Sequence, residues 1–336
     1  MQPSAETTSL ETFQIATPSG SLELLASLPH IPTKQQTLLF IHGAHCAAAC
    51  FNAILPLISR AGYASYALSL RGHGRSWQPS TFAFHALTSL NSYVADVLAG
   101  IRFLVKEHPD ATLVLVGHSM GGGVLQRALM AWEAQEAQQH KIAGLVLLAS
   151  APLSGGGMDV ARNWQAAEAA LAKAQAAEGP VRTAPQPWIL WLLSFFKPKI
   201  NTGVDTPAQV RNKFFSPDTP EDVVRGWIRD SKGRLESIRV SIETFWPLAR
   251  PDAVLAVIGR NNRPIGRKVL CISAEQDVLI LGEVSQKNFD AYRSVCQGEE
   301  EVLHVKLPGS GHHIMLDIAH EHCADIIVKW LQGENL

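Results

Sequence analysis

Short apolar runs alternate with longer amphipathic stretches over most of the chain. The runs are rich in Leu, Ile and Val, as strands are, and the stretches between them have helical periodicity. We expect strands at Glu11–Ala16, Ser21–Ser27, Thr37–Ile41, Ala64–Leu68, Thr112–Val116, Gly144–Ala149, Val269–Ser273 and Glu301–Lys306. Helices are predicted at Ser92–Lys106, Gly122–Ala137, Glu283–Cys296 and Ala319–Leu331. The pattern predicts an α/β fold with a mostly parallel eight-stranded sheet, whose ligands bind beyond the carboxyl ends of the strands.

Two departures from this alternation divide the chain. Pro18-Ser19-Gly20 separates the first two strands and predicts an N-terminal hairpin. The βα rhythm stops after Ser154 and resumes at Arg267. Because a structureless loop of that length is unusual in a compact domain, we expect an inserted helical cap over residues 155–266. The α/β core would then comprise residues 1–154 and 267–336.

The predicted cap contains one strongly apolar run, Trp188–Phe196. Helices that are apolar on all sides are usually buried, so this run either packs inside the cap or lines an apolar substrate pocket. Docking to a membrane surface is disfavoured because the run lacks a basic polar face.

Composition and charge exclude several classes of protein. The 336 residues are 46% hydrophobic and 18% charged, which indicates a large globular protein. A formal net charge of −1 without a basic tract argues against a nucleic-acid partner. Met1–Glu11 lacks the pattern of a secretory signal, and no apolar run is long enough to span a bilayer stably. Five scattered cysteines favour reduced thiols, so we expect a cytoplasmic protein; the sequence leaves its oligomeric state open.

The segment Gly117-His118-Ser119-Met120-Gly121 directly follows a predicted strand and directly precedes a predicted helix. A G-x-S-x-G string in that context is typical of a nucleophile elbow, in which serine lies on a strained turn and glycines avoid backbone clashes. Serine needs a base to accept its proton and an acid to orient that base. Ser119 is therefore the candidate nucleophile, and His118 beside it is expected to be structural.

An acid and a base follow in the order that this chemistry requires. Asp277 comes after the predicted strand Val269–Ser273, and Glu275 is the alternative acid. His312 comes after the last predicted strand, with His313 as the alternative base, because spacing alone does not separate adjacent residues. The carboxyl ends of parallel strands share one edge of a sheet, so Ser119, Asp277 and His312 are expected to converge there.

Acyl transfer also requires N–H donors for the developing oxyanion. The residue after the nucleophile, Met120, supplies one donor in an elbow of this type. We expect the other from Ala44, in the loop after Thr37–Ile41, where Gly43 lets the backbone approach closely.

Two other groups of residues have simpler interpretations. His42, His45 and Cys46 lack a second ligand cluster, so we expect no metal and no cofactor. The segment Arg71–Ser76 matches neither the Walker A nor the dinucleotide-binding pattern, and we expect it to be a structural turn.

Together these motifs resemble the α/β-hydrolase superfamily, and most closely its capped serine hydrolases, which include esterases, lysophospholipases and lipase-like enzymes. The matching positions occur in that family's order: His42-Gly43, Arg71–Ser76, Gly117–Gly121, Asp277 and Gly311-His312. The resemblance implies that Ser119, Asp277 and His312 form the catalytic triad, and it favours His312 over His313. Weaker likenesses lie in the cap, at Phe214-Phe215-Ser216 and Leu235-Glu236-Ser237. Ser69 departs from the pattern, because many relatives carry aspartate there.

The sequence and the resemblance lead to one functional expectation. We expect a serine hydrolase that cleaves carboxylic esters or thioesters with an apolar acyl or aryl group through an acyl-enzyme. The alternatives are a lyase or acyltransferase using the same triad, and a ligand-binding protein with low turnover. A small excess of basic residues in the cap hints at an anionic substrate.

Overall fold

The structure, a computed structural model, describes residues 10–31, 33–136, 142–178, 203–231, 236–258, 266, 268–296, 298 and 301–336. The apolar run Trp188–Phe196 and Leu235, which were singled out from the sequence, lie outside the described residues.

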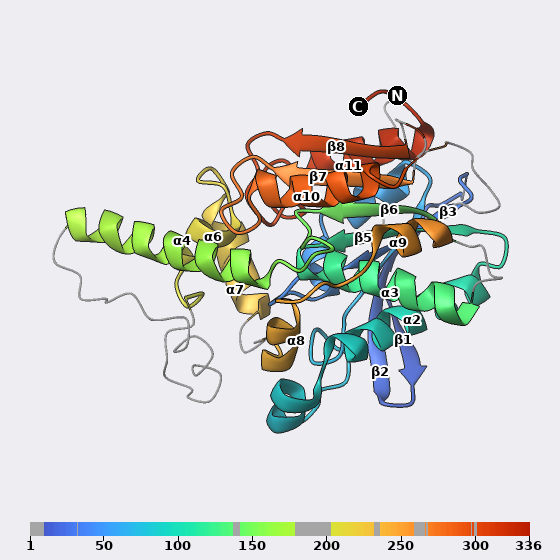
Figure 1. The fold of residues 1–336 in the computed structure, drawn as a ribbon, viewed down its shortest axis with the longest axis horizontal. Coiled ribbons are helices and arrows are strands. Elements are labelled where there is room, and N and C mark those ends of the chain that lie inside the picture. Colours follow the sequence, from blue (N-terminus) through green and yellow to red (C-terminus); the bar gives the residue numbers. More distant parts are fainter. Residues whose placement is uncertain are drawn as a thin grey trace.

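The molecule is built around an eight-stranded sheet with the order β1-β2-β4-β3-β5-β6-β7-β8 (Figure 1). The strands are β1 (Glu11–Thr17), β2 (Gly20–Ser27), β3 (Gln36–Ile41), β4 (Ala64–Leu68), β5 (Thr112–His118), β6 (Ile142–Leu148), β7 (Val269–Ala274) and β8 (Val302–Leu307). β2 pairs antiparallel with both β1 and β4, and the other neighbours are parallel. The predicted mostly parallel sheet and its N-terminal hairpin are confirmed.

Alternate residues of the central strands point to opposite faces of the sheet, as the pleat requires. Leu39 and Ile41 of β3 belong to one hydrophobic core, whereas Leu38 and Phe40 belong to another. The first core is covered by α2, α3, α9 and α10, and the second by α1 and α11. Burial on both faces explains why these strands read as continuous apolar runs.

Helices of the core follow the strands that they cover. They are α1 (Leu55–Arg60), α2 (Leu90–Glu107), α3 (Met120–Glu136), α9 (Pro251–Val257), α10 (Gly282–Arg293) and α11 (His320–Gln332), with the 3₁₀ turn η1 (Ala48–Phe51) and the π-helix η2 (Ala83–Leu87). A capping box explains where α2 begins, because Ser89 and Ser92 each accept a hydrogen bond from the other's backbone N–H. α11 ends at Gly333, whose φ of 76° stops the helix.

The segment predicted as a cap is helical where it is described. It contains α4 (Gly157–Glu178), α6 (Pro207–Phe214), α7 (Glu221–Ser231) and α8 (Ile238–Glu243). α4 projects beyond the body of the sheet (Figure 1). α9 also falls within residues 155–266, but it packs against α3 and α10 of the core. The boundaries 1–154, 155–266 and 267–336 stay a prediction.

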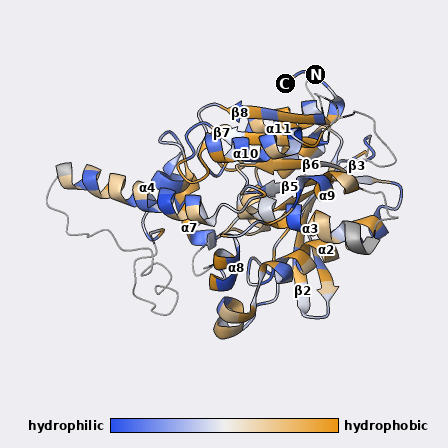
Figure 2. Ribbon diagram, viewed as in Figure 1, coloured by the Kyte–Doolittle hydropathy of each residue, from blue (hydrophilic) through white to orange (hydrophobic). Residues whose placement is uncertain are grey.

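Hydrophobic residues concentrate on the sheet and on the sides of the helices that cover it, whereas α4 mixes both kinds of residue (Figure 2). In the ranges that the structure describes, no helix has both the length and the apolar character needed to cross a bilayer.

Candidate active site

The candidate nucleophile Ser119 forms the whole connection between β5, which ends at His118, and α3, which begins at Met120. Its φ is 52°, a left-handed conformation that a residue with a Cβ adopts only when its surroundings hold it there. The Ser119 N–H donates to the carbonyl of Leu148 at 3.0 Å, and its own carbonyl accepts the N–H of Ala151 at 3.0 Å. Neighbouring backbone on the β6 side therefore holds the strained turn.

Two glycines of the elbow make room for this turn. A Cβ on Gly117 would lie 2.5 Å from the Cα of Gly122, and one on Gly121 would lie 2.3 Å from the carbonyl oxygen of His42. Both distances are shorter than van der Waals contact, so only glycine fits without moving the backbone. This is the steric reason for the G-x-S-x-G spacing in this chain.

A continuous chain of hydrogen bonds joins Ser119 to a histidine and an aspartate. The His312 Nε2 lies 2.9 Å from the Ser119 Oγ, and the His312 Nδ1 lies 2.7 Å from the Asp277 Oδ2. The other Asp277 oxygen accepts the backbone N–H groups of Leu279 and Ile280 at 2.8 and 2.9 Å. Since the Asp277 side chain is fully buried, these bonds fix its orientation toward the imidazole.

The alternative acid and base lie elsewhere. Glu275 is exposed, and its carboxylate pairs with Lys306 at 3.3 Å; hydrogen bonding to the Gly309 N–H and to Lys306 lowers its pKa. The buried His313 ring packs against the aromatic rings of Phe214, Phe215 and Trp227. The structure thus brings Asp277 and His312 to Ser119, and does not place Glu275 or His313 in that chain of hydrogen bonds.

His118, the residue before the nucleophile, contacts the backbone of the candidate base. Its Nε2 donates to the carbonyl oxygen of His312 at 2.9 Å, which assigns the ring proton to Nε2. Burial, together with the charge of the nearby His312, lowers the pKa of His118 well below its usual range. A neutral His118 therefore ties the elbow to the loop that carries His312.

The two expected oxyanion donors lie beside the nucleophile. Ala44 and Met120 both line the cavity that contains Ser119. Among the described residues, neither of their N–H groups donates to the backbone in a turn, a loop or a contact between elements. A Cβ on Gly43 would lie 2.8 Å from the Ser119 Cβ, which explains glycine next to the donor loop. His45 follows in a left-handed conformation, with φ of 61°.

The cavity at Ser119 lies between the loops that follow the strands and the helices α4 and α6, and it has a volume of about 150 Å³. Most side chains around it are apolar. They come from α4, α6, the segment after α8 and the loop after β7, and they include Val160, Ala161, Trp164, Phe214, Phe245, Leu279 and Ile280. The carboxylates among its lining residues are Glu168 and Glu236, and no lysine or arginine is among those lining residues that the structure describes.

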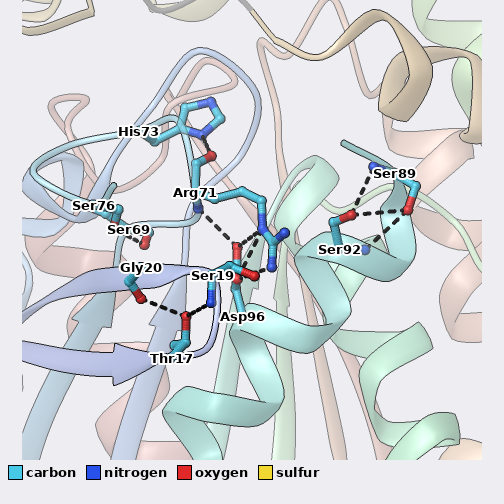
Figure 3. Close-up of polar contacts among 10 residues, drawn as sticks. All are labelled: Thr17, Ser19, Gly20, Ser69, Arg71, His73, Ser76, Ser89, Ser92 and Asp96. Carbon is cyan, nitrogen blue, oxygen red and sulfur yellow. Dashed lines mark hydrogen bonds and ion pairs between the residues drawn. The ribbon is translucent and has the colours of Figure 1, made fainter. Parts of the chain in front are cut away.

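The segment Arg71–Ser76 is held by its own chain rather than left open for a ligand (Figure 3). The Arg71 guanidinium binds Asp96 through two nitrogens, with Nη2 at 2.7 Å from Oδ1 and Nε at 2.9 Å from Oδ2. The Arg71 N–H also donates to Asp96 at 3.0 Å. The His73 ring packs against the His42 ring at an angle of 54°, with centroids 4.9 Å apart. With its guanidinium engaged, Arg71 serves as an internal brace for this turn.

Sequence reasoning missed the role of Glu23. Its buried carboxylate accepts the Ser69 hydroxyl at 2.7 Å and the Arg75 N–H at 2.9 Å. Glu23 on β2 thus places a carboxylate next to Ser69, the position at which many relatives carry aspartate. A charged residue within the apolar strand segment Leu22–Leu25 was the available signal.

Glu236, two residues before α8, was also missed as a contact between the predicted cap and the sheet's own helices. Its buried side chain accepts the hydroxyl of Tyr93 on α2 and the N–H of Ser237. The His73 Nε2 lies 3.6 Å from the second Glu236 oxygen, which is an ion-pair distance but too long for a hydrogen bond. Through one buried carboxylate, the segment before α8 is therefore hydrogen bonded to α2 and lies at ion-pair distance from the Arg71–Ser76 turn. Within the described ranges, no three His, Cys, Asp or Glu side chains gather in a way that would hold a metal ion.

Comparison with known proteins agrees with this architecture. The chain is 32% identical to a pyrethroid hydrolase of Sphingobium wenxiniae over 114 residues, which cover 33% of this chain and 34% of the relative. It is 31% identical to a monoacylglycerol lipase of Mycolicibacterium smegmatis over 88 residues, which cover 26% of this chain and 30% of the relative. The match thus spans about a third of the length of these curated relatives.

Solved structures match over nearly the whole chain. A soluble variant of the monoglyceride lipase of Saccharomyces cerevisiae superposes with a TM-score of 0.64 at 18% identity, covering 98% of each chain. An esterase of Thermogutta terrifontis superposes with a TM-score of 0.60 at 14% identity, covering 96% of this chain and 98% of the other. These likenesses show the α/β-hydrolase fold. Because the model of the serine aminopeptidase S33 family, Hydrolase_4, matches residues 32–221, more than half of the 336 residues, the chain belongs to that family of α/β-hydrolases.

Proposed function

We propose that this protein is a serine hydrolase that cleaves carboxylic esters or thioesters through an acyl-enzyme on Ser119. The observation that carries the proposal is the chain of hydrogen bonds from Asp277 through His312 to Ser119, at 2.7 and 2.9 Å. In this arrangement each residue is placed for one role: Ser119 as nucleophile, His312 as general base and then acid, and Asp277 as the group that orients the imidazole.

The proposed reaction proceeds in two halves. The His312 Nε2 takes the hydroxyl proton while the Ser119 Oγ attacks the carbonyl carbon, and the N–H groups of Ala44 and Met120 bind the oxyanion. The intermediate collapses when His312 returns the proton to the leaving alcohol or thiol. A water molecule, deprotonated by His312, then attacks the acyl-enzyme; His312 returns that proton to the Ser119 Oγ as the acyl–oxygen bond breaks and the acid leaves.

The cavity supports a neutral substrate with an apolar acyl or aryl group. Side chains such as Val160, Phe214 and Phe245 offer apolar contact next to Ser119. Glu168 and Glu236 are the carboxylates of this lining, and an anionic substrate would be repelled by them. The cavity therefore counts against the anionic substrate that the cap's overall charge suggested. The relatives named above as a pyrethroid hydrolase and a monoacylglycerol lipase support ester substrates in particular.

The proposal is tested with p-nitrophenyl esters of increasing acyl length, the matching acyl thioesters, and a fluorophosphonate probe. We expect one covalent label per chain, on Ser119, and no label or turnover in Ser119→Ala. In ¹⁸O-water the released acid should contain one solvent oxygen, which separates hydrolysis from acyl transfer and from lyase chemistry. Turnover by Ser119→Ala at the wild-type rate would refute the proposal. The proposal would also be refuted if the wild-type protein bound ligand tightly but neither reacted with the probe nor hydrolysed any ester.

We also propose a reducing compartment, such as the cytoplasm, as the location of the protein. All five cysteines are free, and all but the partly buried Cys296 are buried. When cells are lysed in denaturant with an alkylating agent and without reductant, mass spectrometry should find all five cysteines alkylated. Recovery of a disulfide-linked peptide would contradict this location.

A further inference from the structure

Two segments far apart in the sequence lie against each other at the candidate active site. They are the base loop, Ser310–Ile318, and the cap segment, Phe214–Thr219. The His313 N–H of the base loop donates to the carbonyl of Phe214 in the cap segment at 2.8 Å. A Cβ on Gly311 would lie 2.6 Å from the backbone of the cap segment. The two backbones are therefore in contact on both sides of His312.

Asp317 joins these segments with one carboxylate. Its Oδ2 accepts the N–H groups of Ser216, in the cap segment, and Gly311, in the base loop, at 2.7 and 2.8 Å. Its Oδ1 accepts the hydroxyls of Ser216 and Thr219 at 2.7 and 2.6 Å, and the N–H of Ile318 at 2.7 Å. One buried group therefore binds three donors from the cap segment and two from the base loop.

The burial of Asp317 makes this junction sensitive to substitution. Its side chain is fully buried, and no lysine, arginine or histidine forms an ion pair with it in the described part of the chain. A buried carboxylate without a cation depends on its hydrogen-bond donors, and each donor in turn depends on the carboxylate. Replacing Asp317 with asparagine would put an NH₂ group against at least one backbone N–H donor in either orientation of the amide, and this conflict would loosen the contact between the two segments.

The contacts of His312 and Phe214 connect this junction to catalysis. Phe214 lines the cavity at Ser119, and its ring centroid lies 6.1 Å from that of His312. His312 lies between Gly311 and His313. The Gly311 N–H donates to the Asp317 carboxylate, and the His313 N–H donates to the carbonyl of Phe214. We propose that Asp317 is a positioning residue, which couples the substrate-contacting cap segment to the base loop and holds His312 at hydrogen-bonding distance from Ser119. This inference rests on the proposed function.

The test compares Asp317→Asn and Thr219→Val with the wild-type protein. Active sites are first counted by end-point labelling with a fluorophosphonate, so that kcat refers to folded, reactive protein only. A displacement of about 1 Å at a catalytic group lowers turnover by on the order of 100-fold, so we expect kcat of Asp317→Asn to fall by about 10- to 100-fold. KM should change by less than kcat does, about threefold at most, because no side chain of the cavity lining is replaced. Thr219→Val removes one of the five donors without changing shape, and we expect a smaller fall in kcat, about 3- to 10-fold, with little change in Tm.

The matched control is Asp159→Asn, which breaks another link between cap and core. Asp159 on α4 pairs with Lys287 on α10 at 2.8 Å, and it neither lines the cavity nor touches the base loop. We expect its kcat to equal that of the wild type. A kcat per labelled site within twofold of wild type in Asp317→Asn would overturn the inference. If Asp317→Asn does not fold, wild-type kcat in Thr219→Val overturns it instead. Absence of labelling in the wild type would refute the proposed function, not this coupling alone.

Discussion

Asp277 and His312 are joined by a 2.7 Å contact between Oδ2 and Nδ1, while the other carboxylate oxygen is held by two backbone N–H groups. Because one oxygen binds His312 and the other binds the backbone, the carboxylate is oriented before any substrate binds. It also assigns the ring proton to Nδ1 and leaves the Nε2 lone pair directed at the Ser119 hydroxyl.

We predict that Asp277→Asn lowers kcat by on the order of 10⁴-fold with little loss of stability. The amide can keep its backbone bonds but no longer fixes the productive tautomer or stabilises the imidazolium. The control is Glu275→Gln, in which an exposed carboxylate of the same loop is neutralised, and its kcat should match that of the wild type. The measurements are kcat and Tm of both variants. A fall in kcat of less than tenfold in Asp277→Asn would show that Asp277 does not orient His312.

A second prediction concerns the carboxylate that β2 supplies. Ser69→Asp restores the residue common among relatives, yet it places a second buried carboxylate against Glu23, whose oxygen lies 2.7 Å from the present hydroxyl. We expect the free energy of unfolding to fall by about 2–4 kcal/mol, because two buried like charges cannot both be satisfied. Glu23→Gln added to Ser69→Asp should recover part of this loss, as measured in a double-mutant cycle of denaturant unfolding. Additive effects of the two substitutions would contradict the proposed contact.

Stability should decrease in mild acid because two buried histidines remain neutral in the folded state. Burial, with the charges of neighbouring histidines, lowers the pKa values of His118 and His313 well below the usual value. As the pH falls below about 6.5, the unfolded chain binds protons that the folded chain does not, so stability is complete above that pH and is lost toward the folded-state pKa. The expected loss is about 1.4 kcal/mol per pH unit for each histidine.

His313→Phe provides the measurement for this pH dependence. Phenylalanine can pack among the same aromatic rings without titrating. The slope of the unfolding free energy against pH should therefore fall by about 0.5 proton near pH 6.5 and by about 0.9 proton near pH 5.5. The exposed His322 serves as control, and His322→Gln should leave the slope unchanged. An unchanged slope in His313→Phe would mean that the folded and the unfolded chain bind the same number of protons at His313.

The cavity wall predicts how acyl-chain selectivity can be altered. Ala161 on α4 lines the cavity, so Ala161→Trp should fill part of the space beside Ser119. We expect kcat/KM for octanoyl esters to fall at least about tenfold relative to acetyl esters, since each lost methylene contact is worth about 0.8 kcal/mol. Ala174→Trp, at an exposed position of the same helix, is the control. An equal effect of Ala161→Trp on both chain lengths would argue against this wall as the acyl site.

Much of the fold was readable from the sequence because its signals are local. Each central strand is buried on both faces and appears as an apolar run, and all eight predicted strands lie within two residues of the observed bounds. The elbow was readable for the same reason, since the clashes that require Gly117 and Gly121 involve residues of the β5–α3 connection and the adjoining β3 end.

The remaining features depend on contacts that no local pattern encodes. His312 and His313 are neighbours in an irregular loop, and the path of the backbone decides which ring reaches Ser119. The contact between Asp317 and Ser216 spans 101 positions of sequence, and the one between Glu23 and Ser69 spans 46. Such pairs depend on how the segment between α6 and α7, and β2, pack against distant parts of the chain. The sequence therefore shows the residues but does not show which of them are in contact.

The central claim, that Ser119 carries the acyl group, is tested most directly by trapping the intermediate. Wild-type protein is mixed with a p-nitrophenyl ester, quenched in acid within the first turnovers, digested and examined by mass spectrometry. We predict the mass of one acyl group on the peptide that contains Ser119, formed with a stoichiometric burst of p-nitrophenol, and neither signal in Ser119→Ala. Turnover without an acylated Ser119 peptide, or with the acyl group on another residue, would contradict the account.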